Sequence, residues 1–361
     1  MSAAPTKSGR EQRVLEIIET ARAKRARFRD ERITLAHGAG GKATQTLIEG
    51  LLVPAFDAAP DTGTLSRLGD AGAVEIQGTH LAMTSDSFVV KPLRFPGGSI
   101  GELAVNGTVN DLAMAGAKPV AMTVSMILEE GLASDTLRAE VRAVADAAVA
   151  AEVEIVGGDT KVVERGAADG MYLCTTGIGA VDARAALSPQ GIRPGDQILV
   201  SGPIGEHGTA IMLARDQFDL DAEIDSDTQP LWPATDALLE ATGSQLHCLR
   251  DATRGGVASV LNELARASGV AMVVREADVP VSPVVAAAAE LLGIDPMYVA
   301  NEGRLVAFVA PEAADSALAA LSGVPGCAGA AAIGEVRDDP PGMVLVATAF
   351  GGRRVMDQLV G

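Results

Sequence analysis

The chain has 361 residues, of which 29 are Lys or Arg and 47 are Asp or Glu, so its formal net charge is −18. Apolar residues make up 48% and charged residues 21%, a composition typical of folded globular proteins rather than disordered chains. A body this acidic repels phosphate backbones, which argues against nucleic acid as a partner. The length favours two domains.

Cysteine usage and hydropathy indicate a protein of the reducing cytoplasm. The three cysteines, Cys174, Cys248 and Cys327, are too few and too scattered for a disulfide framework or a zinc site. No stretch approaches about 18 uninterrupted apolar residues, so we expect no membrane association. The N-terminus has no apolar core of a secretion signal, and its acidic residues argue against a transit peptide.

Residues 1–32 differ from the rest of the chain because they hold nine basic and five acidic residues. Apolar residues recur there at helical spacing, from Val14 to Ala21, followed by a basic run. This pattern predicts a basic helical arm, either laid on the surface of its own domain or docked onto an acidic partner.

From Ile33 onward, short β-rich runs alternate with Ala-rich stretches, which predicts two α/β domains divided near residue 190. We place an N-terminal domain at 33–190, a C-terminal domain at 191–352 and the start of a tail at 353–361. The predicted strands are His80–Thr84, Val120–Ile127, Val153–Val156, Met171–Thr175, Gln197–Val200, Ala271–Arg275, Leu305–Val309 and Met343–Val346. The predicted helices are Ile100–Ala115, Ser134–Ala151, Ser259–Ala267, Val284–Leu292 and Ala313–Leu321.

A glycine-rich segment, His37–Lys42, follows a strand-like run at Ile33–Ala36. Its register puts alanine where a P-loop needs its first glycine and its Ser or Thr, so Walker A chemistry is excluded. The segment also lacks the dinucleotide fingerprint. Gly40, Gly41 and Lys42 can still offer backbone N–H groups and an ammonium to phosphate, and a plain turn explains them equally well.

Acidic and amide side chains recur at the ends of strands and on one helix. Hard carboxylate oxygens with few His or Cys nearby are the ligands that Mg²⁺ prefers, usually beside substrate phosphates, whereas zinc and iron want softer ligands. Any single aspartate of this kind can instead be a loop cap, but the series together favours a metal and phosphate site. The series comprises Asp70, Asp86, Asn106, Asn110, Asp111, Asp159 with Lys161, and Asp251.

Seven segments carry a resemblance to a known family. The chain resembles the HypE family of hydrogenase maturation proteins, within the aminoimidazole ribonucleotide synthetase-like ATP-binding superfamily, from about residue 31 to its last residue. Selenophosphate synthetases share some of the aspartate motifs but not the first or last of these segments. The segments are Ile33–Lys42, Asp86–Leu93, Gly107–Met114, Gly158–Val163, Ser201–Gly208, Thr253–Gly256 and Tyr298–Gly303.

The resemblance implies a two-domain α/β fold (α+β in detail) of the aminoimidazole ribonucleotide synthetase-like type, a homodimer formed through the N-terminal sheets, and ATP with Mg²⁺ in the cleft. It implies metal-binding roles for Asp70, Asp86, Asp111 and Asp251. It also implies that the nucleotide is surrounded by Gly40, Gly41, Lys42, Asp86, Asn110, Asp111 and Asp159.

The chemistry implied by the resemblance begins with a carbamoyl group placed on a C-terminal cysteine by the carbamoyltransferase HypF. ATP phosphorylates the carbamoyl oxygen, phosphate leaves, and the resulting thiocyanate supplies cyanide to iron on the HypC–HypD scaffold. Forming a nitrile also removes protons from nitrogen, so a base must be close. Glu302, with Lys161 as an electrostatic or proton-relay partner, is our candidate, although the two could simply form an ion pair between the domains.

The sequence departs from the family at its end. Family members close with a flexible tail ending in Pro-Arg-Ile-Cys, whereas the sequence given reads Arg354–Gly361 where that tail should begin. We expect the acceptor cysteine to lie in a tail outside the sequence given. Two alternatives stay open: a tail-less superfamily member that phosphorylates a small molecule, or a nucleotide-binding scaffold for maturation partners.

Overall fold

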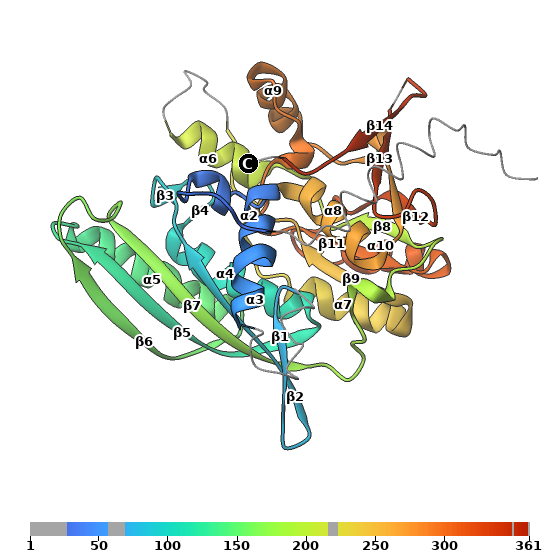
Figure 1. The fold of residues 1–361 in the computed structure, drawn as a ribbon. Coiled ribbons are helices and arrows are strands. Elements are labelled where there is room, and N and C mark those ends of the chain that lie inside the picture. The colour runs from blue at the N-terminus through green and yellow to red at the C-terminus, as the bar shows by residue number, and fades with distance from the viewer. Residues whose placement is uncertain (1–26, 57–68, 216–222, 349, 360–361) are drawn as a thin grey trace, which may run out of the picture. The chain divides into compact units, whose positions relative to one another are not determined.

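The computed structural model describes residues 27–56, 69–215, 223–348 and 350–359 (Figure 1). These residues form two compact units, 27–56 and 69–359, and each is described by itself. The predicted helical arm falls largely on residues 1–26, which lie outside the described residues, and its described end at 27–32 is not helical.

The first unit is a chain of short helices. They are a 3₁₀ turn η1 (Leu35–Gly38), α2 (Lys42–Leu47), a π turn η2 (Ile48–Leu52) and α3 (Val53–Phe56). The strand expected at Ile33–Ala36 is therefore wrong. The backbone N–H of Thr34 donates to Nδ1 of the buried His37 at 3.0 Å, which closes a turn in place of an extended run.

A five-stranded sheet occupies the first half of the second unit. Its strand order is β1-β2-β7-β5-β6, and the neighbours are antiparallel except for the parallel pair β5 and β6. The strands are β1 (Gly72–Ile76), β2 (Thr79–Phe88), β5 (Ala117–Glu129), β6 (Glu154–Val163) and β7 (Met171–Val181). A small hairpin, β3 (Arg94–Phe95) and β4 (Gly98–Ser99), precedes the first long helix.

Two helices pack on one face of this sheet, α4 (Ile100–Met114) directly and α5 (Ser134–Ala150) against α4 (Figure 1). Burial alternates along β7, where Leu173 and Thr175 are buried and Cys174 is only half-buried. Because successive side chains of a strand point to opposite faces, Leu173 and Thr175 face the helices and Cys174 faces the other way. The sheet therefore has a helix-covered face and an opposite face.

A seven-stranded sheet forms the second half, in the order β14-β13-β10-β12-β8-β11-β9. Its strands are β8 (Gln197–Val200), β9 (Leu246–Asp251), β10 (Ala271–Arg275), β11 (Leu305–Val309), β12 (Ala331–Arg337), β13 (Val344–Ala347) and β14 (Arg353–Met356). The helices of this half are α6 (Glu206–Ala214), α7 (Trp232–Thr242), α8 (Gly256–Ser268), α9 (Pro283–Leu292) and α10 (Ala314–Ser322). Short 3₁₀ turns connect them at η3 (Pro189–Gly191), η4 (Gly243–Gln245), η5 (Glu276–Asp278), η6 (Pro296–Tyr298) and η7 (Pro311–Ala313).

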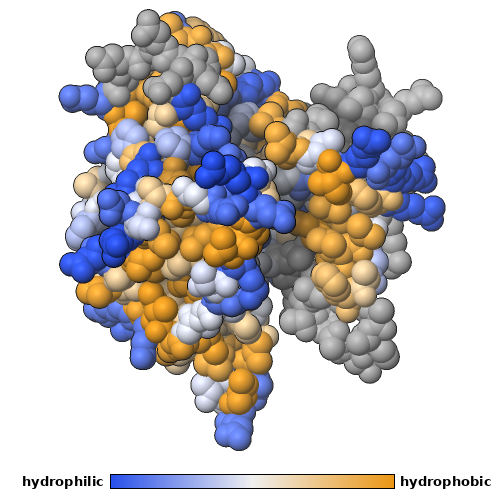
Figure 2. All heavy atoms as spheres, turned by 90° about the vertical axis from the view of Figure 1, so that its left-hand side faces the viewer, coloured by the Kyte–Doolittle hydropathy of each residue, from blue (hydrophilic) through white to orange (hydrophobic). Residues whose placement is uncertain are grey.

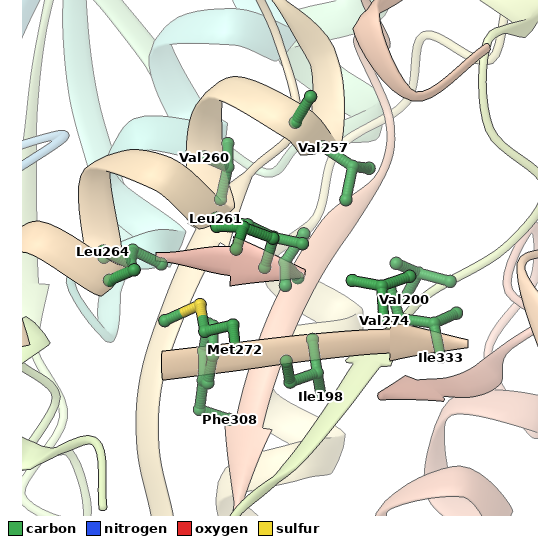
Figure 3. Close-up of a cluster of buried hydrophobic side chains, with 14 of the residues drawn as sticks. Ile198, Val200, Val257, Val260, Leu261, Leu264, Met272, Val274, Phe308 and Ile333 are labelled. Atoms are coloured by element: carbon green, nitrogen blue, oxygen red, sulfur yellow. The ribbon is translucent and has the colours of Figure 1, made fainter. Parts of the chain in front are cut away.

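Both faces of the seven-stranded sheet are packed. Ile198 and Val200 belong to a core with α8, whose Val257, Leu261 and Leu264 face the same strands (Figure 3). Leu199, between those two residues, belongs instead to a core with α7 and α10. Strands buried on both faces read as continuous apolar runs, which is why the sequence pattern located β8, β10 and β11 to the residue.

Helix α4 joins the two halves, because Ala113 and Met114 at its C-terminal end are buried in the same core as α7 and α10. Its N-terminal part is buried against the five-stranded sheet. Thirteen of its residues are buried, which accounts for the lack of an amphipathic pattern in this segment. Among the residues that the structure describes, no helix is both long enough and apolar enough to cross a bilayer.

A candidate acidic active site

Three predicted metal ligands come together in the second unit. Asp70 lies two residues before β1, Asp111 lies near the end of α4, and Asp251 is the last residue of β9. One carboxylate oxygen from each lies within 4.8 Å of the others. The segment that leads into the five-stranded sheet, the joining helix α4 and the seven-stranded sheet each contribute one of these carboxylates, so the cluster depends on the packing of both halves.

The three carboxyl groups all have raised pKa values, so each binds its proton more strongly than an ordinary aspartate does. Burial raises the pKa of Asp70, and burial together with the charge of Asp251 raises the pKa of Asp111 well above its usual range. Burial and the charge of Asp70 raise the pKa of Asp251 to about 8. Crowded, partly desolvated carboxylates are an arrangement that a divalent cation stabilises, because the ion replaces the protons.

Two neighbours support this cluster. The Thr84 hydroxyl on β2 donates to Asp111 Oδ2 at 2.7 Å and so fixes that carboxylate. The Arg250 guanidinium on β9 pairs with Asp70 and lowers its pKa against the effect of burial. Neither residue was predicted. Arg250 immediately precedes the predicted Asp251, but a lone Arg inside a strand gives no sequence signal of such a role.

Asp86 lies inside β2, on the helix-covered face, because it is paired in register with the buried Thr175. Its charge raises the pKa values of Asp111 and Asp251, which places it beside the cluster. Gly107 of α4 faces this strand: a side-chain carbon at that position would lie 2.8 Å from the Phe88 ring. Glycine is therefore needed for α4 to approach the strand that carries Asp86.

Glu302 lies on the same side of the molecule, in the loop that leads into β11. Burial raises the pKa of Glu302 well above its usual range, and the charges of Asp251, Asp227 and Asp86 raise it further. The structure thus brings the predicted base to the predicted metal ligands. A buried carboxylate with a raised pKa accepts a proton more readily near neutral pH than an ordinary glutamate does.

Asn110 contacts the Glu302 loop rather than an open cavity. Its side-chain Nδ2 donates to the backbone oxygens of Gln229 and Glu302 at 3.0 and 3.2 Å, and its Oδ1 accepts from the Leu231 N–H at 2.7 Å. These bonds use both ends of the amide. Asn110, predicted to bind nucleotide, therefore joins α4 to the seven-stranded half in this structure.

Asp159 and Lys161 were predicted to be site residues, but within this chain they lie away from the acidic cluster. They lie inside β6, not after it as the sequence suggested, and form an exposed ion pair of 2.8 Å. Their register partners on β5 are Ser125 and Ile127, and Ser125 pairs with the half-buried Cys174 of β7. Both side chains therefore lie on the face opposite the helices, away from Asp86.

The glycine-rich segment belongs to the first unit. Gly40 has φ of +79°, a conformation that favours glycine, and its N–H donates to the Thr44 hydroxyl at 3.0 Å. Gly41 caps α2, and Lys42 is its first residue. The turn geometry that the sequence allowed is present, and the roles of Gly40, Gly41 and Lys42 towards phosphate stay predictions.

His207 is held by a hydrogen bond and an aromatic contact. His207 lies at the start of α6, where its Nδ1 lies 2.9 Å from the Ser226 hydroxyl and its ring packs edge-on against Phe95. Burial lowers the pKa of His207 to about 4, so the ring is neutral at physiological pH.

Two family models match the chain, and together they cover most of the second unit. The N-terminal domain of AIR synthase related proteins matches residues 68–181, and the C-terminal domain of the same proteins matches residues 193–346. The two sheets and the acidic residues between them thus define a two-domain protein of the AIR synthase related class.

Similarity to individual proteins narrows this class. The chain is 49% identical over 331 residues to the carbamoyl dehydratase HypE of Cupriavidus necator, covering 91% of this chain and 93% of that protein. A crystal structure of a HypE–HypF complex is similar with a TM-score of 0.80 and 42% identity, over 86% of this chain and 99% of that chain. A structure of HypE in complex with ATP is similar with a TM-score of 0.76 and 42% identity, over 91% and 98% of the two chains. The chain belongs to the carbamoyl dehydratase HypE family of hydrogenase maturation proteins.

Proposed function

We propose that this protein dehydrates a cysteine-bound carbamoyl group to a thiocyanate at the expense of ATP, at the cluster of Asp70, Asp111 and Asp251. The observation that carries the proposal is the convergence of these three carboxylates with Glu302 in a member of the carbamoyl dehydratase family. The cluster suits a metal–phosphate group, and Glu302 suits proton removal.

The reaction has two steps. The carbamoyl oxygen first attacks the γ-phosphorus of ATP, ADP leaves, and one proton is lost from nitrogen, giving an S-linked imidate phosphate. The C–O bond then breaks, inorganic phosphate leaves with the bonding electrons, and the second proton leaves nitrogen to form the C≡N triple bond. Phosphorylation is needed because an unmodified carbamoyl oxygen is a poor leaving group. Each step requires a base near the nitrogen.

The residues present fit a magnesium ion. The cluster offers carboxylate oxygens alone, the donor type that Mg²⁺ prefers, and their raised pKa values show that a compensating positive charge would stabilise the site. Asp70, Asp111 and Asp251 would hold the ion, with Asp86 beside them. When bound, it would neutralise charge that develops on the phosphates during transfer.

We assign Glu302 as the base. Its carboxylate lies beside the charges of Asp251 and Asp86, and burial strengthens it as a proton acceptor. Its backbone is held in place from two sides, by Asn110 at its carbonyl and by Asp227 at its N–H. A base that is fixed in this way removes a proton in a defined direction.

The carrier thiol is proposed to be a cysteine other than the three in this sequence. Cys248 and Cys327 are buried, and burial raises the pKa of both thiols, that of Cys248 to about 12. A thiol accepts a carbamoyl group as its thiolate, so neither suits the role. Cys174 is half-buried within β7, beside the Ser87 hydroxyl. A C-terminal cysteine, loaded by a carbamoyltransferase of the HypF type, fits the family.

We propose that the protein is a homodimer formed through the five-stranded sheet of its N-terminal domain. The face opposite α4 and α5 carries exposed apolar side chains on the β1–β2 hairpin, namely Val74, Ile76 and Met83, which are 44 to 52% exposed. Figure 2 shows apolar side chains gathered on the side of the molecule that includes this half. A second copy would bury such a face, and Met83→Asp is expected to convert the dimer to monomers in sedimentation.

The same dimer would give Asp159 and Lys161 a role. Within one chain they lie on the far face of the sheet from Asp86 and three strand spacings away, a lateral distance of about 14 Å. In a dimer through this face they would instead point towards the second copy. We propose that Asp159 and Lys161 act at the nucleotide site of the partner subunit.

We propose further that the thiocyanate product then passes its cyanide to an iron scaffold of the HypC–HypD type.

An isotope experiment tests the proposed reaction directly. The protein, carbamoylated with a heavy-oxygen label on the carbamoyl group, is incubated with ATP and Mg²⁺, and the released phosphate is analysed by mass spectrometry. The proposal predicts one labelled oxygen in every phosphate and one thiocyanate per ADP. Unlabelled phosphate with no thiocyanate would show simple ATP hydrolysis and would exclude the dehydration step.

A further inference from the structure

The loop Asp225–Leu231, which we call the strap, lies between the two halves of the second unit. On one side, the Ser226 N–H donates to the Pro96 oxygen at 2.9 Å, and the Asn106 side chain donates to the Thr228 hydroxyl at 3.1 Å. On the other side, Gln229 Nε2 donates to the Gly303 oxygen at 3.0 Å. The strap therefore contacts the five-stranded half and the Glu302 loop at once.

Asp227 is the residue of the strap that reaches Glu302 itself. Its side chain is completely buried, its Oδ1 accepts the Glu302 N–H at 2.9 Å, and its Oδ2 lies 3.6 Å from Nε of Arg304. Gly303 lies between Glu302 and Arg304 in the sequence. A side-chain carbon at this position would lie 1.8 Å from the backbone oxygen of Asp227. Glycine at 303 is what lets the strap approach so closely.

Glu302 belongs to no helix or strand, so regular structure does not fix its backbone. Two side chains do so instead: Asp227 accepts from its N–H, and Asn110 donates to its carbonyl oxygen at 3.2 Å. With both peptide groups held, the direction in which the Glu302 side chain leaves the backbone is set. A misplacement of about 1 Å in such a group can cost on the order of a hundredfold in rate.

Arg304 does not need Asp227 as a counter-ion, so the burial of Asp227 is not explained by their pairing. Arg304 donates to the backbone oxygens of Pro203 and Gly326 at 2.8 and 3.0 Å and pairs with Glu206 at 2.8 Å. Asp227 Oδ2, by contrast, has no hydrogen-bond partner in the described part of the chain, and burial raises the pKa of this carboxyl to about 6. Burying such an acid lowers the stability of the fold, so the role of Asp227 must be sought in something other than stability.

We propose that Asp227 is a positioning residue for carbamoyl dehydration, which holds the Glu302 peptide so that the Glu302 carboxylate faces the substrate nitrogen. This inference rests on the proposed role of Glu302 as the base. It adds a specific requirement: an oxygen acceptor at the Oδ1 position of residue 227, rather than a negative charge there.

The test compares Asp227→Ala, Asp227→Asn and Glu302→Gln in the carbamoylated full-length protein, with kcat for thiocyanate formation and KM for ATP measured separately. Asp227→Ala is expected to lower kcat about 10- to 100-fold while KM for ATP stays within a factor of about two. Asp227→Asn retains an oxygen acceptor and is expected to recover kcat to within about threefold of wild type. If Asp227→Ala does not fold, Asp227→Glu replaces it, because the longer side chain keeps the charge but displaces the acceptor.

A matched control separates positioning from loss of stability. Glu140 is also a fully buried carboxylate that accepts a backbone N–H, from Gly101 at 3.2 Å, and pairs with an arginine, Arg94, at 2.8 Å, but it lies on α5. Glu140→Ala is expected to lower the thermal midpoint without lowering kcat. An equal loss of kcat in Glu140→Ala, or wild-type kcat in Asp227→Ala, overturns the inference. Full activity of Glu302→Gln would instead overturn the base assignment, whatever the Asp227 variants do.

Discussion

The acidic cluster and the strand β6 illustrate two ways in which one chain holds site residues. Asp70, Asp111 and Asp251 come from three elements of one compact unit and already lie together, at a cost shown by their raised pKa values. Asp159 and Lys161 neutralise each other on an exposed strand. The contrast teaches that the three cluster carboxylates come together within one chain, whereas a role for the β6 pair, as we propose it, requires a second subunit.

Loss of a cluster carboxylate should give the largest effect. In Asp251→Asn we expect thiocyanate formation to fall by about three orders of magnitude, because the variant lacks one of the proposed ligands of an ion that would neutralise the phosphates. The thermal midpoint of the metal-free protein should rise, since burial holds the pKa of Asp251 at about 8 and this carboxyl must take up a proton on folding, whereas Asn needs none. Rate assays measure thiocyanate formation, and thermal melts measure the midpoint. A rate within tenfold of wild type would contradict the assignment of Asp251 to the active site.

Removing the base should have the next largest effect. Glu302→Gln is expected to lower kcat for dehydration at least about a hundredfold, since the amide cannot accept the nitrogen proton. ATP affinity, measured by calorimetry, should change little, because in the proposed site other residues bind the phosphates. Weak ATP binding in this variant would show that Glu302 belongs to the nucleotide site instead.

A variant of Lys161, from the Asp159–Lys161 pair on β6, tests whether this pair acts on the partner subunit. Lys161→Ala should lower the rate about tenfold, equivalent to about 1.4 kcal/mol of lost interaction. Mixing Lys161→Ala subunits with Asp251→Asn subunits should restore about a quarter of wild-type activity if the lysine acts across the dimer, because heterodimers then contain one intact site. No restoration in confirmed heterodimers would mean that Lys161 does not act on the partner subunit.

The smallest expected effect concerns pH and the stability of the metal-free protein. Burial holds the pKa of Asp251 at about 8 and that of Asp227 at about 6, both above the unfolded value of 3.8, so the folded state binds more protons. Stability should therefore rise as pH falls from about 8 to about 6.5. Below pH 6.5 the neutral, buried His207, whose pKa is about 4, opposes this gain because it binds protons only on unfolding.

Thermal melts between pH 8 and 6.5 should show a rise of about 3 °C in the metal-free protein. Mg²⁺ with ATP should flatten this dependence, because the ion competes with protons for the same oxygens. A pH profile unaffected by Mg²⁺ and ATP would contradict metal binding at Asp251.

Sequence patterns predicted β8, β10, β11 and, within one residue, β13 of the doubly packed sheet, together with α4, α5, α8, α9 and α10, because apolar runs and turn residues mark them locally. They missed β1, β3, β4, β9, β12 and β14 and the helices α6 and α7, and they placed a strand at Ile33–Ala36 where His37 closes a 3₁₀ turn. The strand that carries Asp159 and Lys161 runs to Val163, beyond the predicted Val156, since the glycine and polar residues at 157–161 interrupt its apolar run. Strand order, and hence the face on which those two residues lie, is a property of tertiary pairing alone.

The site was predictable to a similar degree. Motifs singled out Asp70, Asp86, Asp111, Asp251 and Glu302, which the structure brings close together, but also Asp159, which lies away from them. Arg250, Thr84 and Asp227 escaped, since each is a common residue whose role depends on a partner distant in sequence: 180 residues for Arg250 and Asp70, and 75 for Asp227 and Glu302. The role of Asn110 towards nucleotide stays a prediction, and in this structure its amide joins the two halves.

The central claim, that the acidic cluster drives dehydration of a carbamoyl group, is tested most directly by the intact mass of the carbamoylated protein before and after addition of ATP and Mg²⁺. The account predicts that the wild-type protein loses the mass of one water per carbamoyl group, and that Asp251→Asn keeps its carbamoyl mass under the same conditions. A carbamoyl mass that persists in the wild-type protein while ATP is consumed would contradict it.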